Sequence, residues 1–333
     1  MDGFGMTPSD STHPDSLPAG ISVIVPVYNS QETLAALLAR LVPILDAIAP
    51  QYEVILVNDG SRDGSWRVIQ ELGATNPRIV GFDMMRNYGQ HNALLCGIRT
   101  ARYDKIVTLD DDLQNPPEEI PKLLAKLEEG FDVVYGKPEA MTHGLWRNLA
   151  SKITKSVLQK AMGADTAGNI SAFRIFRTVV RSAFASYRSP FVSIDVLLTW
   201  GTTRFTAIDV RHEPRTIGVS NYTLRKLMVH ALNMVTGFST WPLQLASMIG
   251  FLFTLIGMGI LLFVVAMRIF VSRTTPGFAF LASVIAIFSG AQLFALGIIG
   301  EYLARLHFRT MERPTFTVRS RLGSEATPTR PGE

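Results

Sequence analysis

The chain has 333 residues, of which 47% are hydrophobic, and its mean hydropathy of +0.21 is high for a wholly soluble enzyme. A formal net charge of +4 is too small to indicate a nucleic-acid partner. The single cysteine, Cys96, excludes an internal disulfide and a cysteine-rich zinc site, and it is most simply a small buried residue in a helix.

Residues 1–20 contain several Asp, Pro and Ser residues but no Lys or Arg. A signal peptide begins with basic residues and continues into an apolar core, and neither feature is present. We therefore expect this segment to be a disordered tail.

From residue 21 onwards, short apolar runs alternate with segments of helical periodicity. The apolar runs, which are typical of buried strands, are residues 21–25, 53–57, 79–82 and 105–109. The segments with helical spacing between them are residues 33–48, 65–72 and 92–101. This alternation predicts an α/β domain over residues 21–221, with a mostly parallel sheet covered by helices on both faces.

Polar clusters follow three of the predicted strands. They are Tyr28-Asn29, Asn58-Asp59 and residues 110–114. In open α/β sheets the ligand binds beyond the carboxyl ends of the strands, so we expect these clusters to form one site.

The acidic triplet Asp110-Asp111-Asp112 comes directly after the fourth predicted strand. Adjacent carboxylates repel one another, and a divalent cation relieves that repulsion. Oxygen ligands suit Mg²⁺ or Mn²⁺, which is often held by one or two carboxylates together with substrate phosphates. A solvated acidic turn before a helix near Pro117 explains the triplet alone equally well, but its position after a buried strand favours the metal site.

The second half of the chain contains the apolar residues expected of a membrane protein. Residues 222–240 alternate apolar and basic residues at helical spacing, which fits an amphipathic helix on a membrane surface and equally a helix packed on the domain. Residues 243–267 and 278–300 carry no charge and are long enough to span a bilayer. Core helices of a soluble domain would normally show a polar face, which these segments lack.

The short connection between the two spans predicts a hairpin with both ends on one side. Basic residues precede the first span and recur in residues 301–333, which we expect to form a basic tail. The positive-inside rule then places the catalytic half and the tail in the cytoplasm, where basic flanks attract lipid phosphates. The glycines of the spans would permit close helix packing in a homo-oligomer.

Four motifs follow one another in a fixed order: Val25-Pro26-Val27-Tyr28-Asn29, then Val57 to Gly64, then Arg86-Asn87-Tyr88-Gly89-Gln90, then Asp110 to Pro117. In order and spacing they resemble glycosyltransferase family 2. Together with the hairpin, they are most similar to the branch that contains dolichol-phosphate mannose synthase and bacterial polyprenyl-phosphate glycosyltransferases. Gly300 to Arg305, followed by Glu312-Arg313-Pro314, is similar to the segment after the membrane in two-span members.

The resemblance implies a GT-A fold, a nucleotide-sugar donor, a Mg²⁺ or Mn²⁺ ion and a polyprenyl-phosphate acceptor. The residues that it assigns to the nucleotide are Pro26, Tyr28, Asn29, Asp59, Gly60, Gln90 and Asp110. It assigns the metal to Asp110, Asp112 and Gln114. Asp111 replaces what is often a small residue, so we expect it to be a bystander.

The resemblance also implies a site for the lipid phosphate. Arg147 and Ser151 are four residues apart, hence on one face of a predicted helix, and they match the family's lipid-phosphate pair. Without the resemblance, a solvated basic face fits them nearly as well. Lys137, Arg215 and Ser220 extend the site, and Asp110, Asp112 and Arg147 are the residues we expect to carry catalysis.

Two departures from the family pattern leave the sugar open. Ser171-Ala172-Phe173 stands where relatives often have Ser-Gly-Phe or an acidic residue, and Asn221 replaces a frequent Lys. We expect an inverting single displacement, because a lipid phosphate oxygen is already anionic and needs no base at Ser171.

Two other functions compete with this hypothesis. A processive polysaccharide synthase is disfavoured because two spans are too few for a polymer channel and the motif Gln-x-x-Arg-Trp is absent. A non-catalytic membrane adaptor is disfavoured by the intact acidic cluster. We therefore expect a membrane-anchored glycosyltransferase that makes a lipid-linked monosaccharide for the cell envelope.

Overall fold

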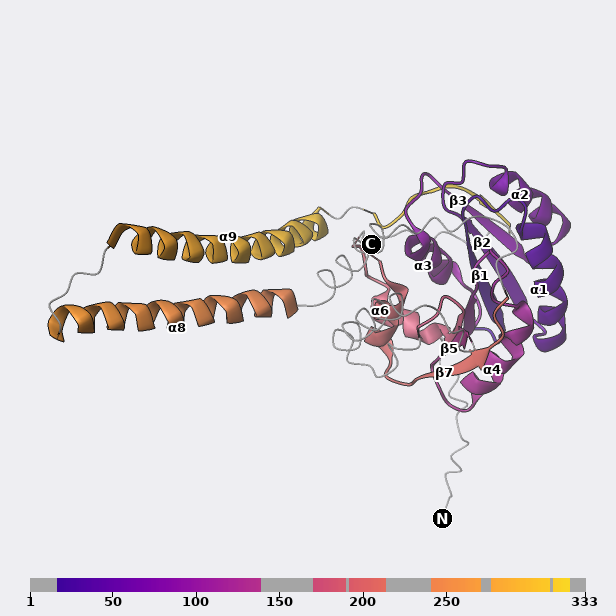
Figure 1. Ribbon diagram of the computed structural model, residues 1–333. Coiled ribbons are helices and arrows are strands. Elements are labelled where there is room, and N and C mark those ends of the chain that lie inside the picture. Colours follow the sequence, from indigo (N-terminus) through magenta and orange to yellow (C-terminus); the bar gives the residue numbers. More distant parts are fainter. Residues whose placement is uncertain are drawn as a thin grey trace, which may run out of the picture.

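Figure 1 shows the computed structural model of the chain, in which an α/β domain is followed by two long helices that lie side by side and extend away from it. The structure describes residues 17–138, 170–189, 192–213, 241–270, 277–311 and 314–323. The expected amphipathic helix at 222–240, and all but the end of the expected N-terminal tail, lie outside these residues.

The domain is built on an eight-stranded sheet with the order β7-β5-β6-β4-β1-β2-β3-β8. The strands are β1 (Ile21–Val27), β2 (Tyr52–Asn58), β3 (Ile79–Met84), β4 (Lys105–Thr108), β5 (Val133–Pro138), β6 (Arg174–Arg177), β7 (Phe205–Val210) and β8 (Val318–Leu322). Strands β1 to β4 are parallel to one another, and β5 and β7 run in the same direction, whereas β6 and β8 are antiparallel to their neighbours. The predicted mostly parallel sheet is confirmed.

Helices cover both faces of this sheet. They are α1 (Leu34–Ile48), α2 (Ser65–Thr75), α3 (Gln90–Thr100), the short helix η1 (Pro117–Glu119), α4 (Ile120–Glu128), η3 (Thr178–Phe184) and α6 (Ile194–Gly201). Apolar residues of α1, α2 and α4 pack on one face, and those of α3, η3 and α6 pack on the other. The first four strands and three helices therefore lie where the sequence predicts them, to within a few residues.

Strand β1 shows why the apolar runs are continuous. All seven of its residues are buried, with Val23 and Val25 in the core beside α1 and Ile24 in the core beside α3. Gly97 lets α3 approach β1 closely, because a Cβ at that position would lie 2.4 Å from Cγ2 of Ile24. A strand that is buried on both faces has no room for the alternating polar residues of a half-exposed strand.

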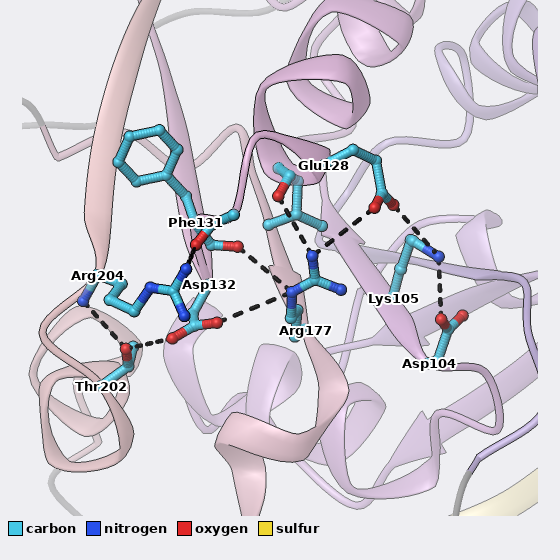
Figure 2. Close-up of polar contacts among 10 residues, drawn as sticks. Asp104, Lys105, Glu128, Phe131, Asp132, Arg177, Thr202 and Arg204 are labelled. Atoms are coloured by element: carbon cyan, nitrogen blue, oxygen red, sulfur yellow. Dashed lines mark hydrogen bonds and ion pairs between the residues drawn. The ribbon is translucent and has the colours of Figure 1, made fainter.

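Charged side chains hold the edge of the sheet where β4, β5 and β7 begin (Figure 2). The guanidinium of Arg177, at the end of β6, lies 3.8 Å from Asp132 and 3.7 Å from Glu128, and it donates to the carbonyl oxygen of Phe131. Thr202 Oγ1 donates to Asp132 at 2.6 Å. These balanced charges tie α4 and the turn before β7 to the start of β5, at the edge opposite the polar clusters.

The helices α8 (Trp241–Phe270) and α9 (Gly277–Thr310) contain two stretches long and apolar enough to cross a membrane, Leu243–Met267 and Ile287–Ala304. Nearly all of both stretches is exposed, with Ala246 a buried exception, so the apolar side chains face outward as they do in lipid. The two helices pack through Gly257, whose missing Cβ would lie 2.9 Å from Cζ of Phe288. These features support membrane association, and α9 continues beyond the expected end of the second span at residue 300.

The expectation that residues 301–333 form a tail is wrong for β8, which pairs with β3 and completes the sheet. Leu322 packs between α2 and β3, where its atoms lie 2.5 and 3.3 Å from the positions of a Cβ at Gly73 and Gly81. A register shift at Asp83/Met84 lets Val318 pack in the other core, beside α3. The sequence did not predict this strand because the arginines of the segment, next to a membrane span, also fit a cytoplasmic tail.

Leu322→Asp tests whether β8 is part of the domain. A carboxylate in this apolar slot has no partner, so we expect the Tm of the detergent-solubilised chain to fall by about 5 °C or more. Intrinsic fluorescence measures the transition, because Trp66 lies beside the same slot at Gly81. Leu322→Met keeps the apolar volume and serves as the control. An unchanged Tm in the Asp variant would show that β8 adds nothing to stability.

Candidate functional site

The carboxyl ends of β1, β2, β3 and β4 meet at one edge of the sheet, and the ends of β5 and β7 lie at the same edge. The strand order reverses at β1, which has β2 and β3 on one side and β4 on the other. Such a reversal opens a crevice between the loops that leave the strands in opposite directions, and ligands bind there. The nucleotide and metal residues predicted from the sequence all lie at this edge, in the loops after these strands or, for Pro26, near the end of β1.

The loops that follow β1 and β2 are fixed to each other. Asn29 has a φ of +54°, a left-handed conformation that Asn tolerates better than most residues. Its backbone N–H donates to Ser61 Oγ at 3.0 Å, and its side-chain oxygen accepts from the N–H of Arg62 at 2.8 Å. Tyr28 beside it is 43% exposed and presents an aromatic ring at the edge. Together they leave a flat apolar surface next to a rigid polar turn.

Asp59 holds the loop that follows β3. Its side chain is only 3% exposed, and its two oxygens accept hydrogen bonds from the N–H groups of Tyr88 and Gly89 at 2.7 and 2.8 Å. Burial raises the pKa of Asp59 to about 6, although these two hydrogen bonds oppose that rise. The contact with base or ribose that the family resemblance implies stays a prediction, and the described contacts of this carboxylate are to the backbone.

Gly60 lies where the loops after β2 and β3 touch. It has a φ of +65°, and a Cβ there would lie 2.5 Å from backbone atoms of Arg86 and Asn87. The glycine therefore permits one loop to approach the other. The family resemblance assigns Gly60 to the nucleotide, and the packing provides a separate reason for a glycine at this position.

The acidic cluster contacts the start of α3 at Asp110. Gln90 Nε2, at the start of α3, donates to Asp110 Oδ1 at 2.7 Å. Farther along, the N–H of Gln114 donates to Asp112 Oδ1 at 3.1 Å, across a turn in which Leu113 has a φ of +59°. A non-glycine residue in this conformation marks a constrained loop, and such constraint is common at functional sites.

Asp111 is not the bystander that the sequence suggested. Its Oδ2 accepts a hydrogen bond from Ser30 Oγ at 2.5 Å and another from the N–H of Tyr28 at 3.2 Å. Burial raises the pKa of Asp111, and these hydrogen bonds act against that rise. This carboxylate therefore joins the loop after β4 to the loop after β1 through its Oδ2.

The residues at this edge fit a divalent ion that takes part of its coordination from a substrate. Within the described ranges, no three His, Cys, Asp or Glu side chains are grouped to hold a metal unaided. Asp110 and Asp112 are partly exposed, and with the amide oxygen of Gln114 they supply hard oxygen donors. Mg²⁺ and Mn²⁺ suit such a set, since they commonly bind one or two carboxylates plus phosphate oxygens.

The acceptor side is described only in part. Lys137 lies near the end of β5 and pairs with Asp209 of β7 at 3.3 Å. Arg147, Ser151, Arg215 and Ser220 lie outside the described residues. The segments that contain them begin directly after β5 and shortly after β7, so both leave the sheet at the edge that carries the acidic cluster.

A buried ion pair that the sequence did not reveal lies beneath the site. Arg174 and Asp195, 1% and 6% exposed, form a direct contact, and Tyr135 donates to the same carboxylate at 3.2 Å. Arg174 Nε also donates to Thr108 Oγ1, which in turn donates to the carbonyl oxygen of Ala172 at 2.6 Å. The network fixes the start of β6 against the end of β4, and its only sequence signal was an arginine at the head of an apolar strand.

Comparison with known proteins identifies relatives along nearly the whole chain. Residues 22–185 match the protein family described as "Glycosyl transferase family 2". An undecaprenyl-phosphate 4-deoxy-4-formamido-L-arabinose transferase of Aeromonas hydrophila is 34% identical over 311 residues, which cover 92% of this chain and 95% of the relative. The protein of that name in Shewanella sediminis is 36% identical over 313 residues, which cover 92% and 94%.

Solved structures also match, at lower similarity, and two serve as examples. Mannosyl-3-phosphoglycerate synthase from Rubrobacter xylanophilus matches with a TM-score of 0.49 and 16% identity, over 65% of this chain and 72% of the other. Glucosyl-3-phosphoglycerate synthase from Mycobacterium tuberculosis, with Mn²⁺ and uridine-diphosphate-glucose, matches with a TM-score of 0.46 and 17% identity, over 66% and 77%.

The buried carboxyl of Asp59 predicts a pH dependence of stability. Folding raises the pKa of Asp59 from its ordinary value of 3.8 to about 6, so the folded chain binds the proton more tightly than the unfolded chain. The contribution of Asp59 to the free energy of unfolding therefore falls as the pH rises from 3.8 to about 6. We expect the Tm of the wild type to fall relative to that of Asp59→Asn across this range.

Thermal unfolding of the two detergent-solubilised proteins at a series of pH values measures this difference. Other groups that titrate in the same range contribute equally to both proteins and cancel. Parallel Tm curves would show that Asp59 ionises with an ordinary pKa.

Proposed function

Because the chain belongs to glycosyl transferase family 2, we propose that it transfers a sugar from a nucleotide diphosphate to a polyprenyl phosphate. The observation that carries this proposal is the convergence at one edge of the sheet. There Gln90 joins the donor-side loops to Asp110, and the segments expected to bind the acceptor leave from β5 and β7. The names of the relatives point to undecaprenyl phosphate as the acceptor.

The donor binds across the loops that follow β1 to β4. Pro26, Tyr28 and Asn29 lie beside the base, with the exposed ring of Tyr28 as a stacking surface. Asp59 and Gly60 fix the loop after β3 beside the ribose. Gln90 and Asp110 face the phosphates of the donor. Each of these groups sits in a loop that cross-loop hydrogen bonds fix before the donor arrives.

Asp110, Asp112 and Gln114 would hold a Mg²⁺ or Mn²⁺ ion. Such an ion neutralises the negative charge that grows on a departing nucleoside diphosphate. The protein's own part is to fix Asp112 in a constrained turn, where Leu113 has a φ of +59° and the N–H of Gln114 donates to the carboxylate.

The lipid phosphate acts as the nucleophile. One of its oxygens forms a bond to the anomeric carbon while the bond from that carbon to the diphosphate oxygen breaks, so the configuration inverts. The oxygen is already anionic at neutral pH, and no side chain needs to remove a proton from it. Arg147 and Ser151, with Lys137, Arg215 and Ser220, would hold the phosphate in line for attack.

The sugar of the relatives, 4-deoxy-4-formamido-L-arabinose, is the first donor to test, carried on uridine diphosphate. Glucose, mannose, galactose and amino sugars on uridine or guanosine diphosphate complete the screen. The helices α8 and α9 would keep the domain at the membrane that holds the acceptor. The basic residues that flank them support a cytoplasmic orientation of the domain and the C-terminus. A lipid-linked monosaccharide made there would serve cell-envelope modification.

Asp112→Asn tests the metal site and the reaction together. Removing one carboxylate charge weakens the ion site, so we expect transfer to fall by about 100-fold or more while the protein stays folded. Radiolabelled nucleotide sugar is incubated with membranes, and label in the organic phase is counted. Asp46→Asn is the matched control, since Asp46 is 51% exposed and its contacts with Arg78 and Tyr52 lie at the start of β2, opposite the edge that carries the site.

The same assay separates the competing functions. Label in polymer would favour a processive synthase, and no label in any phase for the wild type with every donor would favour a non-catalytic adaptor. Transfer by Asp112→Asn at nearly the wild-type rate would contradict the metal assignment.

Arg147→Ala tests the acceptor site. The loss of a guanidinium that binds the lipid phosphate should raise the KM for polyprenyl phosphate by about tenfold and leave the donor KM within about twofold. Initial rates at varied lipid and varied donor give the two constants. A raised donor KM with an unchanged lipid KM would move Arg147 to the donor side.

A further inference from the structure

Arg40 of α1 joins two segments that are far apart in the sequence. Its guanidinium contacts Glu118 of η1 through Nε and Nη2 at 2.9 and 2.8 Å. It contacts Glu213, which follows β7, through Nη1 and Nη2 at 3.1 and 3.0 Å. Each carboxylate therefore receives a bidentate contact, the strongest and most geometrically specific form of this ion pair. The same contacts lower the pKa of both Glu118 and Glu213.

Two further contacts fasten the segment after β7 to the acidic loop. The N–H of Glu213 donates to the carbonyl oxygen of Gln114 at 2.8 Å. Arg211 Nε donates at 2.7 Å to Glu119, whose carboxylate is 1% exposed. Residues 211–213 are thus attached to residues 114–119 at three points, and Arg40 is the only one of the contacting groups that comes from a third element.

These contacts connect directly to the candidate metal loop. Gln114, whose carbonyl oxygen binds Glu213, donates its own N–H to Asp112. On the other side, Glu213 is two residues before Arg215, the first of the predicted phosphate-binding residues after β7. Asp112 and the start of the acceptor segment are therefore separated by only two hydrogen bonds and a few backbone bonds.

We propose that Arg40 is a positioning residue that holds the start of the acceptor segment at a fixed place relative to Asp112. The inference rests on the proposed function, because it assigns Arg215 and Ser220 to the lipid phosphate. Without Arg40, the carboxylates of Glu118 and Glu213 repel each other, and the segment moves away from Gln114. The partly exposed ion pairs themselves add little to global stability, so the effect is local.

Kinetics of Arg40→Ala in the full chain test this role. We expect the KM for polyprenyl phosphate to rise about tenfold while the donor KM changes by less than about twofold, because only the acceptor segment loses its anchor. The KM of Arg40→Lys for polyprenyl phosphate should lie between that of the wild type and that of Arg40→Ala, since an ammonium group keeps the charge but cannot form two bidentate contacts. Arg67→Ala, which removes a 75% exposed arginine paired only with Glu71 of α2, should match the wild type.

Hydrogen–deuterium exchange provides a readout that does not depend on activity. In Arg40→Ala the amide of Glu213 should exchange faster, while the amides of Tyr88 and Gly89, which Asp59 binds, should keep their protection. A Glu213 amide that stays protected, or equal rises in both KM values, would overturn the proposal. If the wild type transfers no sugar to polyprenyl phosphate, the proposed function fails, and the exchange of Glu213 still decides whether Arg40 anchors it.

Discussion

The burial of β1 on both faces is the constraint on which the rest of the domain depends. A strand without a solvent face must lie inside the sheet with a helix layer on each side, and β1 has β2 and β4 as parallel neighbours. Parallel neighbours require crossover connections, so the loops that follow β1, β2, β3 and β4 all emerge at one edge. The sheet topology therefore brings the polar residues of the site together, without a requirement that they attract one another.

Once gathered, the loops are held by carboxylates that differ in their surroundings. Asp59 and Asp111 bind backbone N–H groups or a hydroxyl, and burial raises the pKa of each. Asp110, Asp111 and Asp112 are all partly exposed at this edge. A carboxylate that loses hydration is stable only where hydrogen bonds compensate the loss, so Asp59 and Asp111 serve as fixed points of the loops. Asp110 and Asp112 each accept a hydrogen bond through Oδ1, from Gln90 and from the N–H of Gln114.

The two apolar helices α8 and α9 expose their apolar residues, whereas the domain buries them. Leu and Phe side chains of α8 and α9 are exposed to the surroundings, whereas the same residue types in the sheet are buried. After α9 the chain returns to the domain as β8, where Arg319 lies 3.4 Å from Asp83 and donates to the carbonyl oxygen of Met85 at 3.0 Å. Asp83 also accepts from Asn58 at 2.7 Å, so the last strand is linked to the ends of β2 and β3, which precede it by more than two hundred residues.

The sequence by itself determined the first four strands, the three helices among them, the edge at which their polar ends meet and the two charge-free segments, because each depends on periodicity or composition within a short stretch. It also located Asp110 and Asp112. The tertiary structure alone decided that β8 joins the sheet, that Asp111 binds Ser30 across 81 positions, and that Arg40 binds Glu213 across 173. No local pattern encodes such pairs, since each partner is an ordinary polar residue until the packed sheet brings the two together.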